Sequence, residues 1–224
     1  MNVTAPEKRI TWKSVRGALT RPYPVTPGMV LLVSLPLVYL LIAQRAHTLP
    51  SAKPEFGLDR LIPLVPTWSL VYGALYLFLI LLPVFVLRDR GLIDRTVRAY
   101  LSVWLLSFAV FILYPTVAPR PDSVEGTGFA AWGLRFLYDA DPPYNCFPSL
   151  HVAHSFVSAL ACARIHRPLG RIALLCAAQV AISTLFIKQH YVADVVAGTL
   201  LAVAACAFFY RGLPREAVLE RDCD

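Results

Sequence analysis

Six long apolar segments constrain the fold of this chain more than any other feature. Polar or proline-bearing stretches separate them, and they cover residues 29–43, 67–87, 100–117, 148–163, 172–187 and 192–209. A helix needs about 20 apolar residues to cross the ~30 Å hydrocarbon core, so the shorter segments require tilt or interfacial flanking residues. The chain is 57% hydrophobic and 16% charged, whereas a soluble domain carries about 25% charged residues. We therefore predict an all-α integral membrane protein with six transmembrane helices.

The basic residues indicate how these helices are oriented. In a six-helix arrangement most of the 21 Lys and Arg residues fall on one side, so the net charge of +7 does not call for a nucleic-acid partner. The positive-inside rule assigns that side to the cytoplasm. We expect both termini to be cytoplasmic and the active site to lie at the extracytoplasmic face.

The expected divisions of the chain follow from this topology. They are a cytoplasmic lead over residues 1–27, a membrane catalytic domain over 28–210 and a cytoplasmic tail over 211–224. We expect no cleavable signal peptide, because the first apolar segment begins late and lacks a small-residue cleavage pattern after it. The expected location is a bacterial inner (plasma) membrane, which the chain crosses several times.

Three polar clusters are expected at the outer face, over residues 114–121, 145–151 and 188–194. The fourth and fifth apolar segments form one helix down and one helix back, which returns His190 to the face where His151 begins. Ionisable groups at membrane depth are costly, so such a cluster is a functional site by default.

The first two clusters suit a phosphate group. Pro148 is well suited to the first position of a helix, which would leave the N–H groups of Ser149, Leu150 and His151 free as an anion site. The Ser149 hydroxyl adds a further donor. Arg120 and Lys188 add positive charge, and a guanidinium matches two phosphate oxygens at once.

The third cluster supplies a nucleophile. His190 and Asp194 are four residues apart, so they share one face of a helix. The carboxylate can accept the Nδ1 proton of His190 and leave Nε2 free to attack phosphorus. His151 is then the natural general acid for the departing oxygen.

Several neighbours have plainer interpretations. We expect Asn145, His154 and Tyr191 to support the site from behind, and His154 serves helix packing equally well. Asp139 and Asp141 border the site in a loop, where solvation is the default expectation. A metal site built from the two histidines and Asp194 is disfavoured because the nearby cations would repel it, so we expect neither a metal nor another cofactor.

The connection over residues 120–144 is the longest one outside the six segments. Its aromatic residues recur at helical spacing over 129–138, which predicts a helix at the bilayer surface. An aromatic belt and a lid over the substrate are both compatible with this pattern.

The three clusters together resemble the type 2 phosphatidic acid phosphatase superfamily of membrane lipid phosphatases and phosphotransferases. Its first motif survives as Arg120-Pro121, with Leu113 at the position of the motif lysine. Its second motif reads Pro148-Ser149-Leu150-His151. Its third reads Ser183-Thr184, five residues, His190, three residues and Asp194, with threonine in place of arginine.

The resemblance covers roughly residues 114–198 and implies specific roles. His190 would form a phosphohistidine, His151 would protonate the leaving group, and Asp194 would orient the nucleophile. Arg120, Ser149 and Lys188 would hold phosphate oxygens. The variant motifs are similar to the branch near inositol phosphorylceramide synthases and sphingomyelin synthases, whose members can pass a phosphoryl head group to an alcohol.

These patterns lead us to expect a metal-independent phosphatase acting on a membrane lipid phosphate monoester or diphosphate. A lipid phosphotransferase with an alcohol acceptor is the alternative within the same chemistry. A transporter or proton-relay protein would use buried ionisable groups too, but it predicts internal symmetry and a second cluster at the inner face, and the sequence has neither.

Overall fold

The computed structural model describes residues 25–213, and within this range the chain is helical with no β-strand. The helices are α2 (Pro27–His47), α3 (Gly57–Leu61), α4 (Trp68–Val86), α5 (Arg90–Leu113), α6 (Phe129–Ala140), α7 (Leu150–Ile165), α8 (Arg167–Phe186) and α9 (Val192–Phe209). The predicted lead and tail fall almost entirely on residues 1–24 and 214–224, which lie outside the described range.

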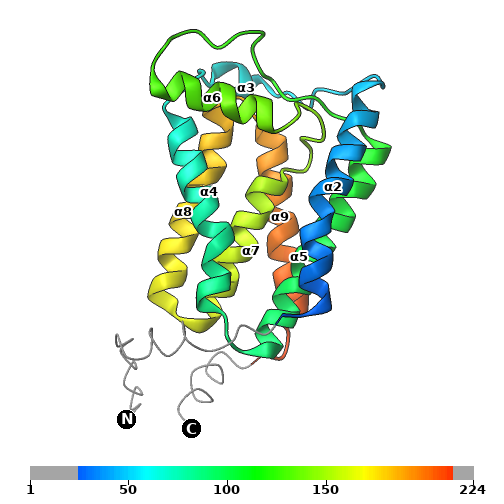
Figure 1. The fold of residues 1–224 in the computed structure, drawn as a ribbon, viewed down its shortest axis with the longest axis vertical. Helices are drawn as coiled ribbons and strands as arrows, with labels where there is room; N and C mark the ends of the chain where they lie inside the picture. Colours follow the sequence, from blue (N-terminus) through cyan, green and yellow to red (C-terminus); the bar gives the residue numbers. More distant parts are fainter. Residues whose placement is uncertain (1–24, 214–224) are drawn as a thin grey trace.

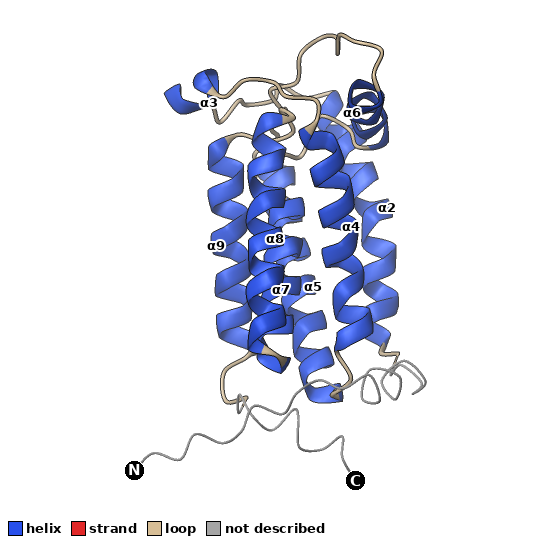
Figure 2. Ribbon diagram, turned by 90° about the vertical axis from the view of Figure 1, so that its left-hand side faces the viewer, coloured by secondary structure: helices blue, strands red, loops and turns tan. Residues whose placement is uncertain are grey.

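The long helices stand side by side, and two shorter ones lie at one end of them (Figures 1 and 2). Helices α3 and α6 occupy this end, and α2 begins and α9 ends at the opposite end. Helix α7 has the most central position, because it packs against α4, α5, α8 and α9, whereas α2 packs mainly on α5. The loops beside α3 and α6 therefore surround the start of α7.

Five of the helices are long and apolar enough to cross a membrane by length and composition. They are α2, α4, α5, α8 and α9, and much of their apolar surface is exposed, as at Val33 and Leu200. Helix α7 is apolar but only 16 residues long, so it falls short of this length. The protein is a multi-pass membrane protein whose central helix is largely covered by other helices.

Helix α5 begins ten residues before the predicted start of its apolar segment. Asp89 caps it, since the side chain accepts a hydrogen bond of 2.8 Å from the backbone of Leu92. Arg90, Arg95 and Arg98, which precede the predicted segment, are therefore helical. Nη1 of Arg95 donates to the backbone oxygens of Phe209 and Arg211. These hydrogen bonds satisfy two carbonyls at the end of α9.

The predicted hairpin between the fourth and fifth segments is formed by α7 and α8. His166 lies between them and accepts a hydrogen bond from the backbone of Leu169 at 3.2 Å, so it caps α8. Gly170 lets the two helices meet closely, because a Cβ there would lie 2.3 Å from the Cα of Ala163. This tight turn brings His190 back to the end of the bundle where His151 lies.

Candidate active site

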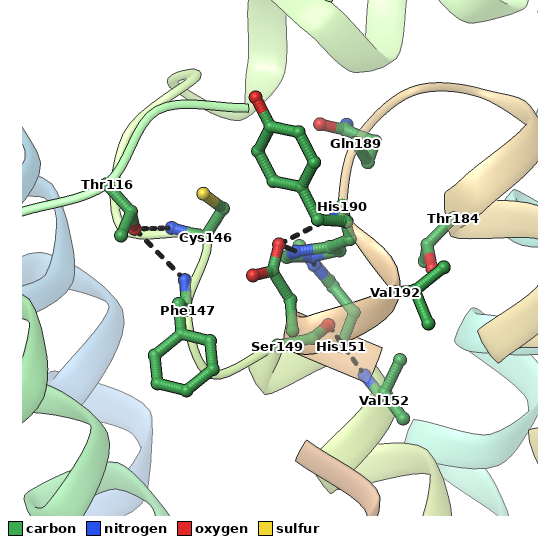
Figure 3. A network of polar contacts seen from close by, with 12 residues as sticks. Thr116, Cys146, Phe147, Ser149, His151, Val152, Thr184, Gln189, His190 and Val192 are labelled. Carbon is green, nitrogen blue, oxygen red and sulfur yellow. Dashed lines mark hydrogen bonds and ion pairs between the residues drawn. The ribbon is translucent and has the colours of Figure 1, made fainter. Parts of the chain in front are cut away.

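His190 lies between a carboxylate and a second histidine (Figure 3). Its Nδ1 is 3.2 Å from Oδ2 of Asp194, and its Nε2 is 3.3 Å from Nδ1 of His151. The backbone N–H of Tyr191 donates to the same Asp194 oxygen at 2.9 Å, which fixes the carboxylate at the start of α9. Asp194 is fully buried and His190 is 5% exposed, so the pair is shielded from water.

His151 is held by aromatic rings as well as by its neighbour. The rings of Tyr72 and Tyr76 from α4 meet it edge-on, with centroids 5.5 and 5.1 Å away. These contacts orient the imidazole without using its nitrogens. The sequence gives no signal for them, because the two tyrosines lie in an apolar segment far from the motifs.

The start of α7 differs from the prediction that Pro148 would be its first residue. The helix begins at Leu150, and Ser149 is its N-cap, with Oγ accepting from the backbone of Val152 at 3.3 Å. The N–H of Ser149 is already used, since it donates to the backbone oxygen of Asp194 at 3.1 Å. A serine is a better N-cap than a proline. The Ser149 N–H, which was expected to be free, is bound by a carbonyl of α9.

The same contact joins α7, which carries His151, to α9, which carries Asp194 and follows the loop with His190. Gly198 of α9 lies so close to α7 that a Cβ would come within 2.5 Å of the Ser149 backbone oxygen. Only a residue without a side chain permits this approach. The separation of His151 and His190 therefore depends on a glycine one turn past Asp194.

Thr116 fixes the loop that leads into α7. Its hydroxyl accepts hydrogen bonds of 3.1 Å from the backbones of both Cys146 and Phe147, and its carbonyl accepts from Asn145. Asn145 has a φ of 61°, a left-handed conformation that asparagine tolerates. Burial raises the pKa of the Cys146 thiol, and the nearby Asp194 carboxylate adds to the effect.

Arg120 is held almost entirely by protein groups. Its Nη1 donates to the backbone oxygens of Tyr138 and Asp141 at 3.1 and 2.8 Å, and its Nε and Nη2 both donate to Oε1 of Gln189. These four bonds leave one of the five guanidinium N–H groups available. Burial lowers the pKa of Arg120, and the charges of Asp141 and Tyr138 oppose that shift.

Asp141 belongs to the site, contrary to the expectation that loop solvation would account for it. Its Oδ2 is 3.7 Å from Nη2 of Arg120 and 4.0 Å from Nε2 of His151, and its Oδ1 accepts from the Tyr39 hydroxyl at 2.8 Å. Neither Asp141 nor Tyr39 stands in one of the sequence motifs. Their approach depends on how α2 and the loop after α6 pack.

Lys188 points away from the two histidines. Its Nζ donates to the backbone oxygen of Asp59 at 3.1 Å, and it does not line the cavity that contains them. The Asp59 side chain accepts from the backbones of Phe56 and Val192 at 2.7 and 2.8 Å. Asp59 thus ties the loop containing α3 to the start of α9, a role that the sequence did not indicate.

Arg120 is the only Lys or Arg residue that lines this cavity within the described range. Leu113, at the position of the motif lysine, is 83% exposed and points to the outside of the bundle. Thr184, at the position of the motif arginine, is fully buried and donates to the backbone of Ala181 at 2.7 Å. Within residues 25–213, no group of three or more His, Cys, Asp or Glu side chains is arranged to hold a metal ion.

The three supporting residues named from the sequence lie around the site at different depths. Asn145 lines the cavity, and its Oδ1 is buried with no hydrogen-bond partner. His154 also lines the cavity, next to the rings of Tyr100 and Trp104. Tyr191 packs with Ala118 and Cys146 beside His190 and Asp194, and burial raises the pKa of its hydroxyl.

The chain is similar in sequence to known proteins. The chain is 29% identical over 126 residues to a PA-phosphatase related-family protein of Dictyostelium discoideum, which covers 51% of this chain and 22% of that protein. It is 30% identical over 170 residues to an uncharacterized protein of Methanocaldococcus jannaschii, covering 76% of this chain and 66% of that protein. The chain therefore spans about a fifth of the first relative and just under two thirds of the second.

No solved structure matches the chain significantly. The PAP2 superfamily model, in contrast, matches residues 57–208, which contain both histidines, Asp194 and Arg120. This match covers well over half of the sequence. The chain belongs to the PAP2 superfamily.

Proposed function

We propose that the protein is a metal-independent membrane lipid phosphatase that hydrolyses a lipid phosphate monoester or diphosphate through a phosphohistidine. One observation carries the proposal: the position of His190, with Asp194 at its Nδ1 and His151 at its Nε2. The nucleophile His190 then contacts its orienting group, Asp194, through one ring nitrogen and its acid–base partner, His151, through the other.

In the first step, Nε2 of His190 attacks phosphorus and a P–N bond forms as the P–O bond to the lipid breaks. Asp194 keeps the proton on Nδ1 and stabilises the positive charge that the ring acquires. His151 donates its proton to the departing oxygen, which leaves as the lipid alcohol or, from a diphosphate, as the lipid monophosphate. General acid catalysis of this kind is typically worth about 10²–10⁴-fold.

In the second step, His151 removes a proton from water, whose oxygen attacks the phosphohistidine. The P–N bond breaks, phosphate is released, and both histidines return to their starting states. Asp141 supports this cycle because its carboxylate, 4.0 Å from Nε2 of His151, favours the protonated ring that donates in the first step and forms again in the second.

Arg120 and Ser149 are our candidates for holding the phosphate oxygens. Arg120 has one N–H group to offer, and the Ser149 hydroxyl accepts from Val152 while its own hydrogen stays available. Lys188 does not hold the phosphate directly in this proposal, because its ammonium group donates to the backbone oxygen of Asp59.

The proposed topology has α7 as a sixth, short crossing inside the other five. Both termini are then cytoplasmic, and the site faces the outer leaflet at the end where α3 and α6 lie. The clustering of arginines at the opposite end of α5 and in the α7–α8 turn supports this orientation. The substrate is a lipid of that leaflet.

The test is phosphate release by purified protein in detergent micelles with a lipid phosphate substrate. His190→Ala is expected to reduce release to background, while His166→Asn, at the opposite end of the bundle with its cap retained, keeps wild-type activity. Radiolabelled substrate should leave an acid-labile, base-stable label on the wild type alone. Retained turnover in His190→Ala, or loss of activity with a metal chelator, would contradict the mechanism.

Phosphotransfer to an alcohol is a second candidate because of the charge balance at the site. Arg120 is the one fixed cation on the cavity wall among the described residues, and the nearby Asp141 carboxylate offsets it. Such a site suits a phosphodiester with one negative charge better than a phosphate monoester with two. Incubation with a phospholipid and an alcohol distinguishes the two: transfer yields a new phosphodiester, and hydrolysis does not.

A further inference from the structure

The cavity that contains the two histidines continues into the bundle beyond them. It has a volume of about 200 Å³, and its outer wall includes Arg120 and Asp141. Its inner part is lined by Pro36, Trp104 and His154, which lie well inside helices α2, α5 and α7. We call this inner part the lower chamber, and the mechanism above uses none of its residues.

His154 is the polar group of the lower chamber. The residue is 5% exposed, and its Nε2 is buried with no hydrogen-bond partner among the described residues. The rings of Tyr100 and Trp104 lie 5.5 and 5.0 Å away, but the Tyr100 hydroxyl is bonded to Ser158 and does not serve His154. An unpaired nitrogen in such surroundings is costly, and an apolar ring would pack there without that cost.

His154 also lies on the same helix as His151, one turn deeper in the bundle. It lies three residues after His151 on α7, so it is about 4.5 Å further along the helix axis, towards the middle of the bundle. A lipid whose phosphate meets His190 and whose tail enters the membrane must pass this level. The atoms that reach it are the first few beyond the phosphate ester oxygen.

We infer that Nε2 of His154 binds a second polar group of the lipid alcohol: an ester carbonyl, an amide or a hydroxyl close to the phosphate. This inference rests on the proposed function and names its substrate class. A glycerol- or sphingoid-type lipid phosphate satisfies His154, whereas an isoprenyl phosphate presents only hydrocarbon to the lower chamber. A site that binds a polar group rejects an analogue that lacks it, because the site's own polar atom stays unpaired.

The activity test compares dioctanoylglycerol phosphate with farnesyl phosphate in mixed micelles. The wild type should favour the acyl substrate, and in His154→Phe the ratio of the two kcat/KM values should fall by about tenfold or more. His154→Gln keeps a hydrogen-bonding group and should retain part of the preference, which guards against a folding defect in the phenylalanine variant. An unchanged ratio in both variants, as expected if only water pairs with His154, overturns the inference and leaves the phosphatase proposal intact.

A binding test separates the two proposals if neither substrate is hydrolysed. Trp104 lines the lower chamber, so its fluorescence can report occupancy once Trp12, Trp68 and Trp132 are replaced by Phe. In a His190→Ala background, dioctanoylglycerol should shift the Trp104 emission, farnesol should shift it less, and His154→Phe should abolish the difference. Equal responses to the two alcohols contradict the inference, whatever the activity measurements give.

Discussion

At the scale of single residues, the two imidazoles are distinguished by the groups behind them. His190 has Asp194 at 3.2 Å in the buried start of α9, and His151 has Asp141 at 4.0 Å in a half-exposed loop. A close, buried carboxylate fixes one ring in a single tautomer, and a more distant one stabilises charge without fixing the ring. The arrangement thus gives the two histidines different tasks although their residue types are the same.

Asp141→Asn should lower kcat by about tenfold to a hundredfold with little change in KM, because His151 loses the charge that favours its protonated form. Tyr39→Phe removes only the hydroxyl that donates to Oδ1 of Asp141, so its effect should be smaller and in the same direction. Steady-state phosphate release measures both. A KM effect alone would assign Asp141 to substrate binding instead.

Cys146 should resist alkylation in the folded protein at neutral pH. Burial raises the pKa of its thiol, so the reactive thiolate is scarce, and it stays scarce as the pH rises to about 8.5, where an ordinary thiol is half ionised. Iodoacetamide labelling followed by mass spectrometry should show slow modification of native protein and fast modification after denaturation. Rapid labelling in the native state would contradict the buried position of this loop.

At the scale of helices, the site depends on how closely α7 and α9 approach. The N–H of Ser149 donates to the Asp194 backbone, and Gly198 lies against the Ser149 carbonyl. His151 and Asp194 therefore both extend from the first turn of a helix whose start is fixed by the other helix. The close contact at Gly170 holds α7 against α8, and the link from Asp59 to Val192 holds the start of α9.

Gly198→Ala should reduce activity at least about tenfold and lower the thermal stability, since the new methyl group forces α9 away from α7 at a cost of about 1–3 kcal/mol. Gly73→Ala is the matched control, because a Cβ at this helical glycine of α4 meets nothing within 4 Å. It should leave activity unchanged. Similar losses in both variants would mean that glycine itself, and not the close contact, matters at these positions.

At the scale of the whole molecule, the bundle separates a basic end from a catalytic end. Arg164, Arg167 and Arg171 lie in and beside the α7–α8 turn. The start of α7, which carries His151, lies at the other end of the bundle, where α3 and α6 are found (Figure 1). Helix α6 lies across that end and exposes Phe129, Trp132 and Phe136, a pattern suited to the membrane interface.

This arrangement predicts opposite accessibility for two engineered cysteines in a cysteine-free background. A membrane-impermeant maleimide should label Asp122→Cys, in the exposed loop before α6, on intact cells. It should label Arg167→Cys, at the exposed start of α8, only after permeabilisation. The reverse pattern would place the site in the cytoplasm and contradict the proposed topology.

The sequence by itself determined the features that depend on local geometry. Apolar segment lengths predicted the long helices, and the spacing of four residues predicted the contact between His190 and Asp194, which is 3.2 Å long. The expected shared helical face was wrong, because His190 lies in the loop before Tyr191, the N-cap of α9, and only Asp194 is helical. The hairpin return of His190 to the level of His151 followed from counting residues in two helices. The predicted start of α7 at Pro148 was two residues too early. The preference of Ser149 for the N-cap outweighs the preference of Pro148 for the first helical position.

Only the tertiary structure decided which charges surround the two histidines. Asp141 meets His151, Arg120 is enclosed by carbonyls and Gln189, and Lys188 turns to Asp59, a residue 129 positions away. A long side chain can reach many partners, and the partner it meets depends on how loops from distant parts of the chain pack over the helix ends. Local spacing therefore specified the contact between His190 and Asp194, and long-range packing specified the electrostatic environment around it.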